Sequence, residues 1–169
     1  MATTTAGTAA ARQGTLAAAT AVSSQASDEF EVLELLTHLV DKSLVVVERV
    51  AADRVRYRLL ETSRQFAQQK LNDAREGEAE RRRHVEYFVT WAEAREELAV
   101  GPQRGKWLLD MGSEHQNVLA ALDWCDGAAG RAEQALRLVA AVWRYWPTRG
   151  LSFWNAKRAN CKVPASAST

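Results

Sequence analysis

The spacing of apolar residues divides the chain into four segments of unlike character. The first, residues 1–27, is rich in Ala and Thr and has Leu16 and Val22 as its larger apolar residues. So few apolar side chains bury too little surface to offset the entropy of ordering a chain. We therefore predict that residues 1–27 are disordered or loosely helical. The alternative is a signal peptide, with Arg12 preceding the apolar run.

Residues 28–76 show a helical pattern followed by an alternating one. The first helix is predicted by apolar residues at i, i+3, i+4, i+7 and i+8, namely Val32, Leu35, Leu36, Leu39 and Val40. Ser27 or Asp28 is its expected N-cap. Residues 44–47 then predict a short buried strand.

A second strand is predicted after the polar connection 48–54. Apolar Val55, Tyr57 and Leu59 alternate there with Arg54, Arg56 and Arg58, which predicts a hairpin with one apolar and one basic face. A helix should resume near Thr62, with Phe66, Ala67 and Leu71 turned inward. Helix, hairpin and helix in this order predict the second half of a winged helix, so residues 28–76 form a partial winged-helix domain.

Residues 77–150 are predicted to be helical hairpins. Successive apolar faces comprise Val85, Phe88, Val89 and Ala92; then Trp107, Leu108, Met111, His115, Val118, Leu119 and Leu122; then Ala132, Ala135, Leu136, Val139, Trp143 and Trp146. Trp91, Trp107, Trp124 and Trp143 follow one another at 16, 17 and 19 residues, about half of a tetratricopeptide unit. This spacing favours stacked antiparallel hairpins, and an irregular helical bundle is the alternative. Residues 151–169 are expected to form an irregular tail.

Candidate chemistry is sparse along the whole sequence. The phosphate-binding loop GxxxxGK[ST] and the GxSxG elbow are both absent from these 169 residues. Glu80 and His84 form a local i, i+4 pair, which we interpret as an exposed charge contact and not as metal ligands. Cys125 is expected to be a small core residue. We predict no enzyme activity, no cofactor, no metal site and no catalytic residues.

The charge distribution bears on nucleic-acid binding. The chain has 22 basic and 21 acidic residues and a formal charge of +1, which does not have the basic excess of a dedicated nucleic-acid binder. The helix before the hairpin would be the recognition helix, and its exposed positions are Glu29, Glu31, Glu34, Thr37, His38 and Asp41. Four carboxylates would face the phosphates. DNA contact is therefore not expected, although Arg54, Arg56 and Arg58 are possible phosphate contacts.

Several segments in the expected order carry a family resemblance. Residues 32–45 and 56–67 resemble the winged-helix end of NB-ARC-type (STAND) signalling ATPases. Residues 81–88, 114–124 and 135–143 are similar to the helices that follow in large bacterial transcriptional regulators with a tetratricopeptide array. The resemblance implies a winged helix that packs on a nucleotide-binding core, and helical repeats that bind a partner or effector.

The resemblance also implies a nucleotide-sensing His-Asp pair at the strand-to-helix junction. Leu60 and Glu61 occupy those positions here. Leucine cannot donate a hydrogen bond to phosphate, so we interpret this position as a degenerate sensor.

These observations predict a non-enzymatic, cytoplasmic interaction module of a signal-responsive regulator. Its expected partner is a protein or an ATPase core, with no membrane association, since no apolar run reaches the length of a membrane span. One alternative is a nucleic-acid-binding accessory protein that uses the wing arginines and the basic C-terminal end. Residues 127–169 hold seven basic residues and one acid. The other alternative is a truncated gene product with little function.

Overall fold

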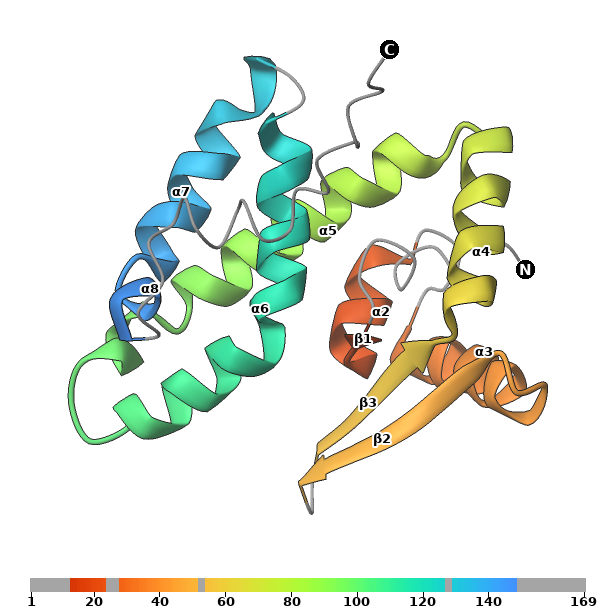
Figure 1. The fold of residues 1–169 in the computed structure, drawn as a ribbon, viewed down its shortest axis with the longest axis horizontal. Coiled ribbons are helices and arrows are strands. Elements are labelled where there is room, and N and C mark those ends of the chain that lie inside the picture. The colour runs from red at the N-terminus through yellow and green to blue at the C-terminus, as the bar shows by residue number, and fades with distance from the viewer. Residues whose placement is uncertain (1–12, 24–27, 52–53, 127–128, 149–169) are drawn as a thin grey trace, which may run out of the picture. The chain divides into compact units, whose positions relative to one another are not determined.

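The computed structural model describes residues 13–23, 28–51, 54–126 and 129–148 (Figure 1). It divides the chain into two compact units, Met1–Trp91 and Ala92–Thr169. Each unit is described by itself below. The predicted fold class, mostly helical with a winged helix, is confirmed.

The first unit combines helices with a small antiparallel sheet. Its elements are β1 (Gln13–Gly14), α2 (Leu16–Val22), α3 (Glu29–Asp41), β2 (Val45–Ala51), β3 (Arg54–Leu59), α4 (Glu61–Asp73) and most of α5 (Gly77–Glu93). The strand order is β1-β3-β2, so β3 is central. The short strand β1, the two helices α2 and α3 and the hairpin of β2 and β3 follow one another in the order of a winged helix. The hairpin forms the wing.

Residues 1–27 were predicted to be disordered or loosely helical, and the described part of this segment contains a short strand and a helix. Gln13 and Gly14 pair with Arg58 and Tyr57 on β3, and α2 follows at once. Thr15 caps α2, its Oγ1 accepting a hydrogen bond from the Ala18 backbone N–H at 3.2 Å. Alanine favours helix. Residues 1–12 and 24–27 lie outside the described residues.

The core of this unit lies where α2 and α3 pack on one face of the sheet. Ala19 of α2 and Val32 and Leu36 of α3 form a buried cluster, against which Leu16 and Tyr57 pack. The alanines give too little apolar area for α2 to fold alone, but their small size lets α2 approach α3 closely. Most of the apolar surface that holds α2 in place therefore comes from α3 and Tyr57, and not from α2 itself.

Two expectations for α3 and α4 had different outcomes. Asp28 is the N-cap of α3 as predicted, its Oδ1 accepting from the Glu31 N–H at 2.9 Å. Ala67 and Leu71 of α4 are buried together. Phe66 was expected to be buried as well, and this is wrong, because its side chain is 63% exposed and lies beneath the Lys70 ammonium at 5.5 Å.

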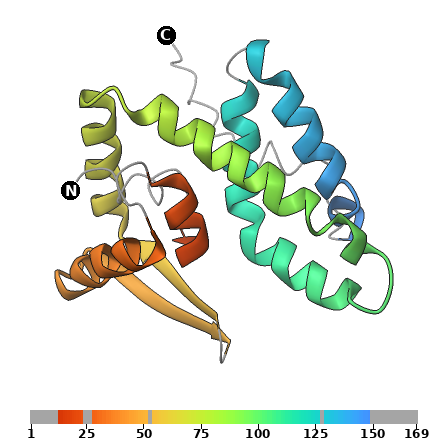
Figure 2. The same cartoon turned by 180° about the vertical axis from the view of Figure 1, so that it is seen from behind.

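The second unit consists of a helical hairpin and short helices. Its elements are the 3-10 helices Glu96–Ala99 and Ala129–Arg131, and the helices α6 (Arg104–Asp126), α7 (Ala132–Val142) and α8 (Tyr145–Thr148). Figures 1 and 2 show α7 running back along α6 after the turn. Trp107, His115, Tyr145 and Trp146 form a chain of ring contacts with centroids 5.3–6.3 Å apart.

The predicted inward face of α7 is wrong. Leu136 and Trp143 are 70% and 51% exposed, whereas Leu138, Ala141 and Val142 are buried. The reason is that α7 has apolar residues on more than one side, so its sequence does not fix which side packs. Because Trp107 is buried and Trp143 is exposed, the tryptophan spacing does not mark equivalent positions. Tetratricopeptide-like repeats therefore stay a prediction.

Candidate nucleic-acid interface

The wing is a regular antiparallel hairpin over most of its length. Val45 pairs with Leu59, Val47 with Tyr57 and Glu48 with Arg56, and the register shifts between Arg49 and Ala51. Both strands extend into residues 48–54, which were predicted to be a connection. Val45, Leu59 and Tyr57 share the face that meets the core, whereas Glu48, Arg56 and Arg58 lie on the opposite, outer face.

The three predicted phosphate contacts are in three different environments. Arg54 is half-buried at the start of β3. Arg56 is buried, with 5% of its surface exposed, although it lies on the outer face. Arg58 is paired with Glu48, with 2.6 Å between Nε and Oε1. The predicted basic face therefore exists in register but does not present three open guanidinium groups.

Arg49 was not among the predicted contacts, yet it is the exposed arginine of the wing. Its side chain points into solvent from β2, and it has no ion-pair partner within the described ranges. The strand β2 continues past residue 47 as far as Ala51, and Val50 and Ala51 are apolar residues that were compatible with this extension. Reading residues 48–54 as a polar connection concealed it.

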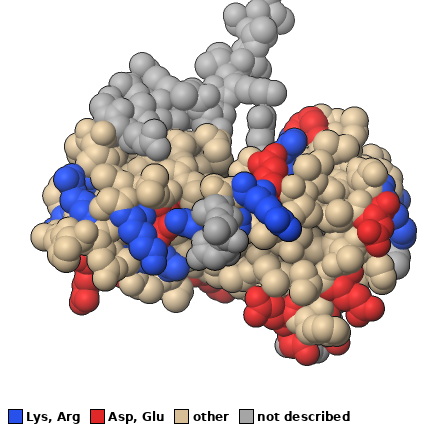
Figure 3. All heavy atoms as spheres, turned by 90° about the horizontal axis from the view of Figure 1, so that it is seen from below, with Lys and Arg blue, Asp and Glu red and all other residues tan. Residues whose placement is uncertain are grey.

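The outer face of α3 is acidic, as predicted. Glu29, Glu31, Glu34, Thr37, His38 and Asp41 are all exposed. In the view from below, acidic side chains gather on the side of the first unit where α3 lies (Figure 3). Phe30 and Leu33 are also exposed on this helix, at 75% and 38%. The helix therefore offers carboxylates and apolar side chains rather than cations.

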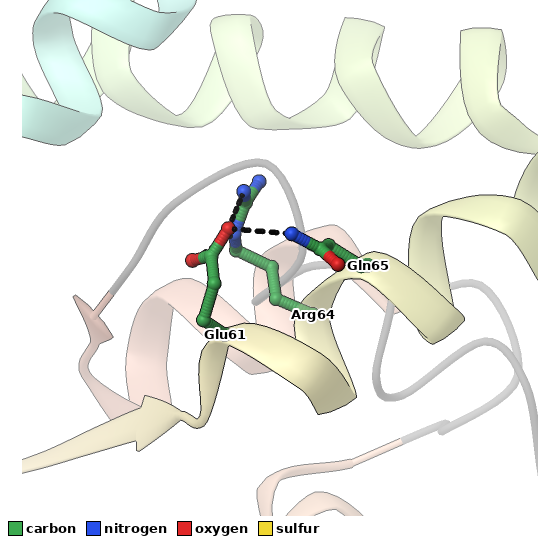
Figure 4. Close-up of polar contacts among 3 residues, drawn as sticks. All are labelled: Glu61, Arg64 and Gln65. Atoms are coloured by element: carbon green, nitrogen blue, oxygen red, sulfur yellow. Dashed lines mark hydrogen bonds and ion pairs between the residues drawn. The ribbon is translucent and has the colours of Figure 1, made fainter.

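The predicted degenerate sensor lies at the start of α4. Leu60 is the N-cap residue of α4 and makes no side-chain cap hydrogen bond. Glu61 accepts two hydrogen bonds from Arg64, at 2.6 and 3.1 Å, and one from Gln65 at 3.3 Å (Figure 4). The hydrogen bond that Arg64 donates to the Glu61 carboxylate raises the pKa of Arg64. A carboxylate thus occupies this helix N-terminus, and its role as a former nucleotide sensor stays a prediction.

Glu80 and His84 do not form the exposed charge contact that the sequence predicted. Both are buried, at 2% and 3% exposure, because α5 turns this side inward. Glu80 forms an ion pair with Arg83, and the His84 ring lies 4.8 Å from that of Phe88. Burial lowers the pKa of His84 to about 4. In the part of the chain that the structure describes, no three potential metal ligands cluster.

Two other expected features can be placed. Cys125 is a buried free cysteine, as predicted. Of the basic C-terminal end, residues 149–169 lie outside the described residues. Within the described part, Arg137 forms a bidentate pair with Glu93 at 2.7 and 2.8 Å, and Arg144 lies 3.6 Å from Glu96. These two cations are therefore engaged within the second unit.

The first unit is similar to a known domain family. Residues 10–72 match the winged helix-turn-helix domain family. This range covers β1 and α2 as well as the wing, which agrees with the order of elements in the structure. The match begins nearer the N-terminus than residue 28, where the sequence predicted that the winged-helix domain starts.

The chain is also similar to curated mycobacterial proteins. Mb0914c of Mycobacterium bovis, and MT0914 and Rv0890c of Mycobacterium tuberculosis, are each 36% identical over 134 residues. All three are named, provisionally, as HTH-type transcriptional regulators. The match covers 76% of this chain but 15% of each relative. No solved structure matches the chain.

These findings correct one prediction and refine others. A winged helix-turn-helix domain and homology to HTH-type regulators point to DNA binding, so the expectation that DNA contact does not occur is wrong. A regulatory role fits both findings.

The relatives are named as regulators and not as enzymes. The comparisons name no NB-ARC ATPase, so the resemblance to that family stays a prediction. No helix in the described ranges has the length and apolarity to cross a membrane.

Proposed function

We propose that this chain is part of a DNA-binding transcription regulator and that its wing contacts the DNA backbone. The observation that carries this proposal is the winged helix itself. Its three-stranded sheet, with the strand order β1-β3-β2, lies within residues 10–72, which match the winged helix-turn-helix family. Such a protein would act in the cytoplasm, where bacterial DNA lies. The relatives are much longer than the match, so the activity of a whole regulator is part of the proposal.

The wing carries arginines whereas the outer face of α3 carries carboxylates, so the wing is the favoured phosphate-binding element. Arg49 is exposed and Arg54 is half-buried near the tip of the hairpin. Lys and Arg bind DNA by neutralising phosphates and releasing counterions. The carboxylates of α3 would instead be repelled by phosphates, so their presence restricts how the domain approaches DNA. We infer an orientation in which the wing is nearer to the backbone than the outer face of α3 is.

Binding of a labelled mixed-sequence duplex, measured by fluorescence anisotropy at low salt, tests the proposal. Arg49→Ala with Arg54→Ala should weaken binding at least about tenfold, since phosphate contacts dominate affinity. The control is Arg104→Ala, which removes an exposed arginine at the start of α6 and should leave the affinity within about twofold. Equal losses in both variants, or no binding by the unaltered chain, would reject the proposal.

A second role is favoured by the exposed face of α7. We propose that α6 and α7 begin a tetratricopeptide-like array in a longer regulator, as the resemblance to NB-ARC-type regulators implies. Exposed Leu136 and Trp143 support this, because a further helix of an array would cover them. In a structure of the full-length Mycobacterium tuberculosis relative, the position equivalent to Trp143 should be covered by a following helix. An exposed position would contradict the array.

A further inference from the structure

On the outer face of the sheet, Arg58 is held by a hydrogen-bonded carboxylate. Arg58 on β3 pairs in register with Gln13 on β1 and with Val46 on β2. Glu48 is two residues beyond Val46 and therefore lies on the same face as Arg58. Glu48 accepts a hydrogen bond from Arg58 Nε at 2.6 Å and one from Gln13 Nε2 at 3.3 Å. All three strands thus contribute to a single polar cluster, Gln13–Glu48–Arg58.

This cluster contributes little to stability. The side chains of Glu48 and Arg58 are each 37% exposed, and ion pairs at such exposure are screened by water. The carboxylate nevertheless lies next to the guanidinium on the face that the wing shares with Arg54. Its main physical effect is therefore on the charge that the wing presents.

Arg58 binds Glu48 through Nε alone. Its Nη1 and Nη2 atoms have no acceptor in the part of the chain that the structure describes. A phosphate could reach these two nitrogens, but it would then lie close to the Glu48 carboxylate and be repelled by it. Gln13 holds the other oxygen of that carboxylate, which hinders Glu48 from turning away.

We propose that Glu48 masks Arg58, so that Arg58 adds less to DNA affinity than an unpaired wing arginine does. This inference rests on the proposed DNA binding by the wing. It makes Glu48 a residue that sets the affinity of the wing, without itself contacting DNA. Neutralising Glu48 should turn Arg58 into a full phosphate contact.

A double-mutant cycle with the mixed-sequence duplex tests the mask. Arg58→Ala is measured in the unaltered chain and in Glu48→Gln, an isosteric change that keeps a hydrogen-bond acceptor. Glu48→Gln should tighten Kd several-fold and steepen the dependence of log K on log salt by about 0.9, one phosphate contact. Arg58→Ala should abolish this gain, so its effect on Kd should be larger in the Glu48→Gln background than in the unaltered chain.

The matched control is Glu34→Gln, which removes an exposed carboxylate of α3 that has no ion-pair partner among the described residues. Arg58→Ala should have the same effect in this background as in the unaltered chain. The mask is overturned if Arg58→Ala weakens binding equally in the Glu48→Gln and Glu34→Gln backgrounds. If the unaltered chain fails to bind while Glu48→Gln binds, the mask is supported and the proposed function of the chain fails. If neither binds, both are rejected.

Discussion

Arg83 joins two helices of the first unit through its guanidinium group. Its Nε donates to the Val22 carbonyl at the end of α2 at 3.0 Å, and its Nη2 donates to the buried Glu80 carboxylate. A buried carboxylate needs such a partner, because an unpaired charge in the interior is strongly destabilising. One side chain thus binds a helix end and one oxygen of a buried acid together, and ties α5 to the segment that was expected to be disordered or loosely helical.

His84 makes the stability of the chain dependent on pH. Burial lowers its pKa from the usual 6.5 to about 4, and its Nε2 is buried without a hydrogen-bond partner among the described residues. The unfolded chain therefore binds a proton that the folded chain excludes. The resulting stability is complete above pH 6.5 and is lost as pH falls toward 4, by about 3 kcal/mol in total.

Urea unfolding at pH 7 and at pH 4.5 measures this contribution. His84→Leu should remove the histidine part of the loss, so that the variant loses about 2–3 kcal/mol less than the unaltered chain. His38→Gln, at an exposed position of α3, serves as the control and should retain the full loss. An unchanged loss in His84→Leu would show that His84 is not the group responsible.

At the scale of elements, the short helix α2 is expected to depend on its N-cap. It has seven residues, four of them alanine, and helices this short are unstable in isolation. Thr15→Ala removes the cap hydrogen bond to the Ala18 N–H and should lower the free energy of unfolding by about 1 kcal/mol. Chemical denaturation measures this change directly.

Thr20→Ala provides the comparison within the same helix. Thr20 bonds only to the Leu16 carbonyl of its own helix, and alanine is the better helix former, so this change should be neutral or slightly stabilising. Equal destabilisation by Thr15→Ala and Thr20→Ala would mean that the cap does not stabilise α2.

The sequence predicts elements well where their own residues decide the structure. The apolar stripe of α3 and the Asp28 cap were predicted because both are local patterns. The ordering of α2 depends on α3 and Tyr57, which its own residues do not reveal. Likewise, the buried side of α7 is chosen by packing, and this is why the prediction of Leu136 as a core residue failed.

The candidate site was predicted in part for a similar reason. Alternation along β3 identified Arg54, Arg56 and Arg58 as one face of a strand. It could not show that Arg56 is buried or that Glu48 reaches Arg58, since both depend on how the strands pair and on what packs beside them. The acidic face of α3 was predicted correctly, but it was used as an argument against DNA contact, whereas charge on one element restricts only the manner of approach.

At the scale of the whole molecule, acidic and basic residues are distributed unevenly between the two halves of the chain. Residues 28–97 contain 16 acidic and 12 basic residues, and residues 98–169 contain five acidic and nine basic ones. The net charge of +1 is therefore a sum in which opposite charges cancel. Within the winged helix, acidic residues lie on the helix α3 and basic residues on the wing. DNA affinity in such a chain should be modest and strongly dependent on salt.

The most direct test of the central claim, that the wing binds DNA, is the salt dependence of duplex binding. In the unaltered chain, log K should fall linearly with log salt. Arg49→Ala with Arg54→Ala should reduce this slope by about 1.8, the equivalent of two phosphate contacts, and Arg104→Ala should leave it unchanged. A slope that is the same in the unaltered chain and in the double variant would contradict the account.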